Sequence, residues 1–127
     1  MKVLIKYKPD TSEIKVTRKD CYNLDSVLAK VILASLKKFI KINIGAPNIA
    51  DEEVPDRLSR KNAKPRKSEY TVDSNHFKRW KWVLKEMIWS FEQIAADLDI
   101  TVESKEHIER VDNGLRLFGK YFRSLWL

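Results

Sequence analysis

A chain of 127 residues, 43% hydrophobic and 34% charged with only 3 Gly and 4 Pro, predicts one globular domain and excludes a low-complexity or disordered polymer. The single cysteine, Cys21, excludes an internal disulfide. No segment approaches the roughly 20 apolar residues of a membrane span, and the start of the chain lacks a signal-peptide pattern. We therefore expect an intracellular protein with no membrane partner. The net charge of +7 is concentrated in residues 1–43, where ten Lys and Arg face four Asp and Glu, and this excess fits either an anionic partner or solubility alone.

Two β-prone segments predict a β-hairpin within residues 1–19. The segments Val3 to Tyr7 and Glu13 to Arg18 flank the turn-forming sequence Lys8-Pro9-Asp10-Thr11-Ser12. Because an isolated hairpin is only marginally stable, it must pack on helices or pair with another chain. An exposed edge strand would be one route to oligomers.

A first helix, followed by a long loop, is predicted after the hairpin. The helix is capped by Asn23 or Asp25 and ends near Ile42, before Gly45 and Pro47. Residues 44–73 carry three of the four prolines and show no sustained periodicity, so we expect a loop that could contain one short helical turn. Loops of this length are usually functional or disordered, and the sequence does not choose between these.

Two further helices complete the predicted fold. One runs over about 76–98 after a cap on Ser74 or Asn75, and the next over about 103–125. The apolar positions at helical spacing in the two helices are Phe77, Trp80, Leu84, Met87, Ile88, Phe91, Ile94 and Leu98, and then Ile108, Val111, Leu115, Phe118, Phe122 and Leu125. The predicted fold class is α+β and mostly α, with a three-helix core and an N-terminal β-hairpin in a single domain, 1–127.

Two tryptophans of the helix at 76–98 do not fit a simple surface helix. At about 100° per residue, Trp82 and Trp89 point away from the predicted core, seven residues apart on one side. The residues around them are Lys78, Lys85, Glu86 and Gln93. Something should cover two such side chains. Three interpretations stay open: a helix buried on two sides, a subunit interface, or an aromatic platform for a base or another planar ligand.

The last predicted helix carries a row of cations and two glycines. Arg116, Lys120 and Arg123 recur at i, i+4 and i+7, which fits a phosphate clamp as well as a solvated face. Gly114 and Gly119 each cost about 1 kcal/mol relative to Ala inside a helix. They therefore indicate a bend, or a close approach of another backbone or of a ligand.

No pattern in the sequence identifies catalytic residues, a metal or a cofactor. There is no phosphate-binding glycine loop, nucleophile elbow or zinc motif. An enzyme of metal-dependent phosphate chemistry would need His76, Glu86 and Asp25 to meet in one pocket. Enzyme activity is therefore unsupported by the sequence.

Taken together, several segments from Asp20 onward resemble a family of uncharacterised proteins carried by tailed bacteriophages. The resemblance rests on Asp20-Cys21-Tyr22-Asn23-Leu24-Asp25, Gly45-Ala46-Pro47, Asp51-Glu52-Glu53-Val54-Pro55, Ser74-Asn75-His76-Phe77, Trp82-Val83-Leu84, Met87-Ile88-Trp89 and Asn113-Gly114-Leu115-Arg116-Leu117-Phe118-Gly119-Lys120-Tyr121-Phe122. The chain departs from the family pattern at Lys85 and Leu127, where an acidic residue is expected. The resemblance implies a phage-encoded protein that acts in the cytoplasm of the infected host, and it supplies no activity and no catalytic residues.

These observations lead to three hypotheses about function. The first is a non-enzymatic phage accessory protein that binds a nucleotide-like ligand or nucleic acid and could counter host defence, either by sequestering such a ligand or by masking a host protein. Its ligand-binding residues would be Arg116, Lys120, Arg123, Trp82, Trp89 and Lys78. The second is a homo-oligomeric structural or protein-interaction module with the two tryptophans at its interface. The third is the metal-dependent enzyme described above.

Overall fold

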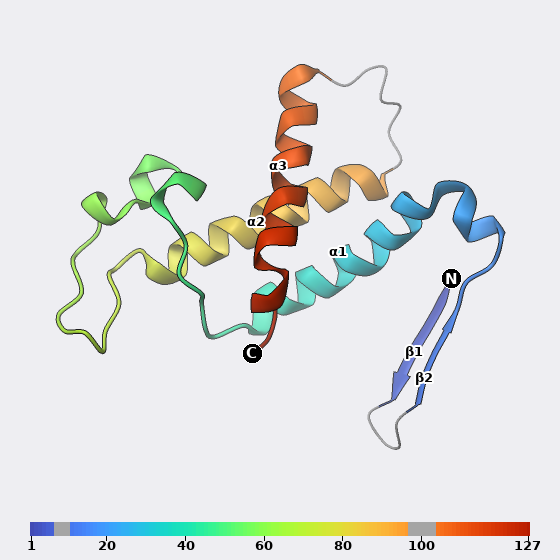
Figure 1. Ribbon diagram of the computed structural model, residues 1–127, viewed down its shortest axis with the longest axis horizontal. Coiled ribbons are helices and arrows are strands. Elements are labelled where there is room, and N and C mark those ends of the chain that lie inside the picture. Colours follow the sequence, from blue (N-terminus) through green and yellow to red (C-terminus); the bar gives the residue numbers. More distant parts are fainter. Residues whose placement is uncertain (7–10, 97–103) are drawn as a thin grey trace.

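The computed structural model describes residues 1–6, 11–96 and 104–127 and has the predicted fold class: mostly helical, with three α-helices and a two-stranded hairpin (Figure 1). The elements are β1 (Lys2–Lys6), β2 (Thr11–Lys15), α1 (Leu24–Ile42), α2 (His76–Ala95) and α3 (Lys105–Tyr121). Residues 97–98 and 103, where the sequence places one end of each of the last two helices, lie outside the described residues. No helix in the described ranges is long and apolar enough to cross a membrane.

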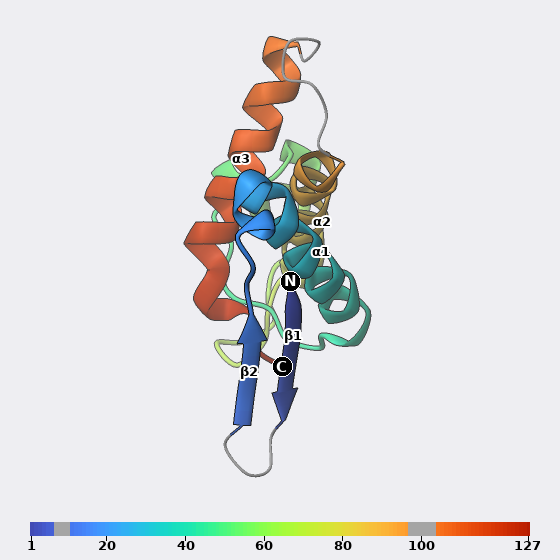
Figure 2. The same ribbon diagram turned by 90° about the vertical axis from the view of Figure 1, so that its right-hand side faces the viewer.

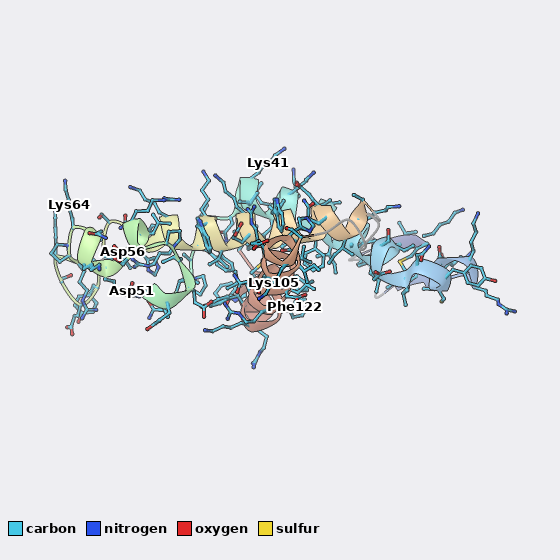
Figure 3. All side chains as sticks on the ribbon, turned by 90° about the horizontal axis from the view of Figure 1, so that it is seen from above. Lys41, Asp51, Asp56, Lys64, Lys105 and Phe122 are labelled. Carbon is cyan, nitrogen blue, oxygen red and sulfur yellow. The ribbon has the colours of Figure 1, made fainter. Side chains whose placement is uncertain are left out.

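Helix α2 is the centre of the fold, with α1 and α3 packed against it. Viewed from above, α3 is seen nearly end-on where it crosses α2, and the molecule is elongated, with the loop at one end and the hairpin at the other (Figure 3). Phe77, predicted to be in the core, is 55% exposed, whereas Val83 is fully buried. The fully or nearly fully buried apolar side chains of α2 are Trp80, Val83, Leu84, Met87 and Phe91.

A glycine determines how closely α3 approaches α2. A Cβ on Gly114 would lie 1.8 Å from Ser90 Oγ and 2.8 Å from the carbonyl oxygen of Glu86, so only glycine fits there. The close approach that the sequence offered as one explanation for Gly114 is therefore the one found. Around Gly119 no atom lies within 4 Å of the corresponding Cβ position, apart from its chain neighbours and the backbone of its own helix.

The buried face of α3 differs from the predicted one. Because Gly114 faces α2, the residues three and seven positions later, Leu117 and Tyr121, share its face and are buried. Leu115 and Phe122, predicted to be in the core, are instead 37% and 58% exposed. The prediction was wrong because it assigned the buried face from the large apolar side chains, although the close approach indicated at Gly114 lies on another face.

The starts of α1 and α2 lack the side-chain capping hydrogen bonds that the sequence predicted. Asn23 and Asn75 occupy the N-cap positions of α1 and α2, but neither side chain makes a capping hydrogen bond. Asn75 Nδ2 instead donates to the carbonyl oxygen of Ser59 at 3.3 Å, which ties the loop to the start of α2. At α3 the cap is Ser104, whose Oγ accepts a hydrogen bond from the His107 amide at 3.1 Å.

The segment 44–73 is a loop, as predicted, with three short 3₁₀ turns where one helical turn was expected. The turns are Asp51–Glu53, Asp56–Leu58 and Arg60–Asn62. Ile49 before the first turn, Val54 between the first two and Leu58 in the second are buried in the same core as the helices. Three apolar anchors therefore hold the loop against the helical body.

The two strands of the hairpin pair antiparallel, with Lys2 opposite Lys15 and Val3 opposite Ile14. The residues predicted to form the turn include Pro9 and Asp10, which lie outside the described residues. In both side views the hairpin extends away from the helices (Figures 1 and 2).

Candidate anion-binding site

A small pocket beside Trp82 is lined by cations. Its volume is about 170 Å³, and its lining residues are Arg57, Leu58, Lys78, Lys81, Trp82 and Lys85, which we call the Trp82 surface. Lys78, Lys81 and Lys85 share one face of α2 because three and four residues each make about one helical turn. Arg57 comes from the second 3₁₀ turn of the loop.

The loop segment that supplies Arg57 is fixed to α2 by a buried arginine. Arg79 is fully buried, and its Nη1 donates to the carbonyl oxygen of Leu58 at 3.0 Å, while its Nη2 donates to Asp73. Burial opposes ionisation of Asp73, but the hydrogen bonds from Arg79 and the Asn75 amide outweigh it and lower the pKa of Asp73 below its ordinary value. The residue next to Arg57 is thus held in a defined position.

The charges of the Trp82 surface are not balanced within the described part of the chain. None of its lining residues is acidic. Among described residues, no carboxylate lies within ion-pair distance of Arg57, Lys78, Lys81 or Lys85. Trp82 is half-buried and packs against the core, so the cations stand beside a partly exposed indole. This combination can attract an anion and also contact an apolar or planar group.

The predicted phosphate clamp on α3 holds an internal carboxylate instead. Arg116 Nη2 lies 2.5 Å from Glu53 Oε2, and Lys120 Nζ lies 2.9 Å from Glu53 Oε1. The hydrogen bond from Arg116 is the main cause that lowers the pKa of Glu53, and the bond from Lys120 adds to it, while burial opposes both. Arg123 does not continue the row, because it lies in the 3₁₀ turn Phe122–Ser124 after α3 ends.

Trp89 is also used within the molecule. The guanidinium of Arg110 lies 3.9 Å from the Trp89 ring centroid, and the His107 ring meets Trp89 edge-on with centroids 5.2 Å apart. Arg110 in turn forms two hydrogen bonds to the carboxylate of Glu86, the shorter at 2.8 Å. The two predicted tryptophans therefore do not form one exposed platform: side chains of α3 pack against the half-buried Trp89, and only Trp82 belongs to the cationic surface.

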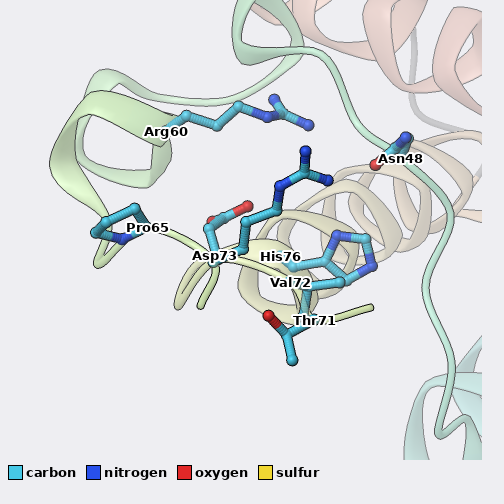
Figure 4. Close-up of a pocket in the computed structure, with 8 residues that line it drawn as sticks. Asn48, Arg60, Pro65, Thr71, Val72, Asp73 and His76 are labelled. Carbon is cyan, nitrogen blue, oxygen red and sulfur yellow. The ribbon is translucent and has the colours of Figure 1, made fainter. Parts of the chain in front are cut away.

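A larger pocket of about 410 Å³ lies between the loop and the start of α2 (Figure 4). Most of its charged groups already have partners. Arg60 Nη1 donates to Asp51 at 2.9 Å, Asp73 accepts from Arg79, and the His76 ring contacts the carbonyl oxygen of Ala46 at 3.2 Å. The lining residues are Asn48, Arg60, Pro65, Arg66, Thr71, Val72, Asp73 and His76. We call this the loop pocket, and its contacts mainly hold the loop on α2.

The residues of the catalytic hypothesis do not come together. His76 and Glu86 are ten residues apart on α2, which separates their backbones by about 15 Å. Glu86 is paired with Arg110, and Asp25 lies in the first turn of α1. Within the described ranges no three His, Cys, Asp or Glu side chains are grouped so that they could hold a metal ion. The three residues of the catalytic hypothesis therefore do not meet in one pocket.

The sequence identified Trp82 and Lys78 and noted Lys85, but it missed Lys81 and Arg57. The spacing of Lys78, Lys81 and Lys85 on one helix face was a usable signal for Lys81. No local signal marks Arg57, because its position depends on the contact of the loop with the buried Arg79.

Comparisons of the chain with models of protein families, with curated proteins and with solved structures give no match.

Proposed function

We propose that this chain is a non-enzymatic binding protein for a nucleotide-like ligand or nucleic acid, and that the ligand binds at the Trp82 surface. The observation that carries the proposal is the set of four cations around one indole with no carboxylate among the lining residues. Phosphate groups would meet the cations, and a base would stack on Trp82.

The length of the surface favours a ligand with more than one phosphate. Lys78 and Lys85 are seven residues apart, which separates their backbones by about 10 Å along α2. A ligand with several phosphates can neutralise each cation of such a row separately. Dinucleotides, nucleoside polyphosphates and single-stranded nucleic acids carry phosphates over this span, and each offers a planar base.

The clamp of Arg116 and Lys120 has a smaller part in this proposal than the sequence suggested. Both cations bind Glu53, so an external phosphate would have to displace a carboxylate that is already well placed. The cations of the Trp82 surface have no such competitor in the described chain. Their charge is available to an external anion.

The resemblance to proteins of tailed bacteriophages supplies the biological setting of the proposal. A small phage protein in the host cytoplasm that sequesters a nucleotide or masks nucleic acid could counter a host defence that depends on it. No catalytic group is needed for that role, since binding alone removes the ligand from its receptor.

Fluorescence anisotropy with a labelled single-stranded oligonucleotide tests the proposal, with unlabelled nucleoside polyphosphates as competitors. Replacing both Lys81 and Lys85 with Ala should weaken binding about tenfold or more. It should also reduce the slope of log K against log salt by about 0.7 for each phosphate group that the variant no longer neutralises. Trp82→Ala should weaken binding by about 1–3 kcal/mol, because a base can no longer stack on the indole.

The matched control removes the same charge elsewhere. Lys30 and Lys41 are exposed on α1, so their replacement with Ala lowers the net charge equally without touching the Trp82 surface. Equal decreases in affinity in the two double variants would show that only net charge matters and would contradict the proposal. So would a wild-type chain that binds neither the oligonucleotide nor its competitors at low salt.

A further inference from the structure

The hairpin has an apolar face that nothing in the described chain covers. Neighbouring side chains on a strand point to opposite faces, and Val3 pairs with Ile14 across the hairpin. Val3, Ile5 and Ile14 therefore share one face, and Val16 continues it just beyond β2. These four side chains are 43–56% exposed, although alternation of this kind is the pattern of a sheet that packs on a core.

Contacts at the base of the hairpin direct it away from its own helices. The carboxylate of Asp20 accepts hydrogen bonds from the Thr17 amide at 2.7 Å and from the α-amino group of Met1 at 2.9 Å. These bonds close the base of the hairpin onto the 3₁₀ turn Lys19–Asn23 that leads into α1. The strands then point away from the helical body, as Figures 1 and 2 show.

An isolated two-stranded hairpin with half-exposed apolar side chains is only marginally stable, and three or more strands are usually needed. We propose that β2 pairs antiparallel with β2 of a second copy of this chain, which gives a four-stranded sheet across a two-fold axis. The partner is a second copy because the charges of β2 are complementary to themselves.

The complementarity follows from the positions of Glu13 and Lys15 on either side of Ile14. In a two-fold pair centred on Ile14, Glu13 lies opposite the partner's Lys15, and Lys15 lies opposite the partner's Glu13. Within one chain these two side chains are on the same face, with Lys15 Nζ 3.1 Å from Glu13 Oε1, and both are exposed. Opposite charges directly across an antiparallel pair stabilise it, and like charges destabilise it.

The other edge of the hairpin does not offer such a pair. The sequence of β1 contains no acidic residue, so a two-fold arrangement of β1 has no pair of opposite charges across it. The same register on β2 also brings Ile14 next to the partner's Ile14 and joins the two apolar faces. An exposed strip on the first part of α1, formed by Leu24, Leu28 and Val31, lies at the same end of the molecule and can extend this interface.

Sedimentation velocity on the full chain, at several concentrations, tests the pairing. The wild type should be a dimer. Glu13→Lys and Lys15→Glu should each raise the dimer Kd about tenfold or more, because each turns two attractions into two repulsions. Far-UV circular dichroism should show the same helix content in all variants, since the hairpin lies outside the helical core.

Two rescues separate pairing from simple damage to the hairpin. An equimolar mixture of the Glu13→Lys and Lys15→Glu chains should dimerise, because each position then faces the opposite charge. The double variant with both changes in one chain should also dimerise. The control variant Lys64→Glu, at an exposed position in the loop, should sediment as a dimer like the wild type. A monomeric wild type would overturn the proposal, as would single reversals that remain dimeric or fail to complement each other.

Discussion

Two sets of cations on neighbouring helices look alike in the sequence and differ completely in the structure. On α3, Arg116 and Lys120 enclose the carboxylate of Glu53 and so attach the acidic part of the loop. On α2, Lys78 and Lys81 face outward beside Trp82, and no carboxylate lines their pocket. The first set holds the fold together, whereas the second is left with its charge unbalanced.

The two sets of cations differ because the loop places different residues against each helix. Its acidic turn Asp51–Glu53 reaches α3 and its second turn, Asp56–Leu58, reaches α2. The first contributes a carboxylate, and the second contributes Leu58 and Arg57. A row of cations is therefore an anion site only where the tertiary structure supplies no internal anion.

The largest effect should come from Arg79, the one cation that is fully buried among the described residues. Arg79→Ala removes the partner of Asp73 and the donor to Leu58, and leaves a carboxylate that is largely shielded from water without its cation. Removing one partner of a buried pair costs about 3–5 kcal/mol. Urea unfolding followed by circular dichroism measures the change, and Arg123→Ala on the exposed 3₁₀ turn should change stability by less than about 0.5 kcal/mol. A destabilisation by Arg79→Ala as small as this control would contradict a structural role for the buried cation.

A second large effect is expected where α3 meets α2. Gly114→Ala places a Cβ against Ser90 and the backbone of α2, and overpacking of this kind typically costs about 1–3 kcal/mol. Gly119→Ala has open space around it and should raise stability by up to about 1 kcal/mol through helix propensity. Thermal unfolding of the two variants should therefore shift in opposite directions. Two shifts of the same sign would contradict the close contact at Gly114.

The Glu53 contact should give a smaller effect that depends on pH. Because the pKa of Glu53 is lowered in the folded protein, its contribution is present above the unfolded pKa of about 4.3 and disappears as pH falls through the folded pKa. Glu53→Gln should cost about 1 kcal/mol at pH 7, less at high salt, and nothing once the pH is below the folded pKa. Urea unfolding across pH 3–7 gives this difference, and a cost that is independent of pH would exclude the ion pair as its source.

The sequence predicted the positions of the helices better than it predicted which face of a helix is buried. Helical periodicity located all three helices, since long apolar repeats are a strong local signal. It misplaced Leu115 and Phe122, because it assigned the buried face from large apolar side chains, whereas the contact between α2 and α3 is centred on Gly114. The partner of Arg116 lies 63 residues away on a loop, and no local pattern connects the two. Sites that depend on such long-range contacts cannot be predicted from local spacing.

A modest gain in stability should accompany a large loss of binding when one cation of the Trp82 surface is replaced by an acid. Lys81 lies three residues after Lys78 and four before Lys85, so three like charges crowd one face of α2. Lys81→Glu replaces two repulsions with two attractions, each worth about 0.2–0.5 kcal/mol. Urea unfolding should therefore show a slightly more stable protein.

The same substitution places a carboxylate among the remaining cations, as Glu53 does on α3. An internal anion at the Trp82 surface should abolish oligonucleotide binding at low salt, while Lys81→Gln should only weaken it. A substitution that raises stability but abolishes binding is expected where neighbouring cations repel one another in the free protein and bind an external anion. If Lys81→Glu bound the oligonucleotide as well as the wild type did, the unbalanced charge on α2 would have no role in binding.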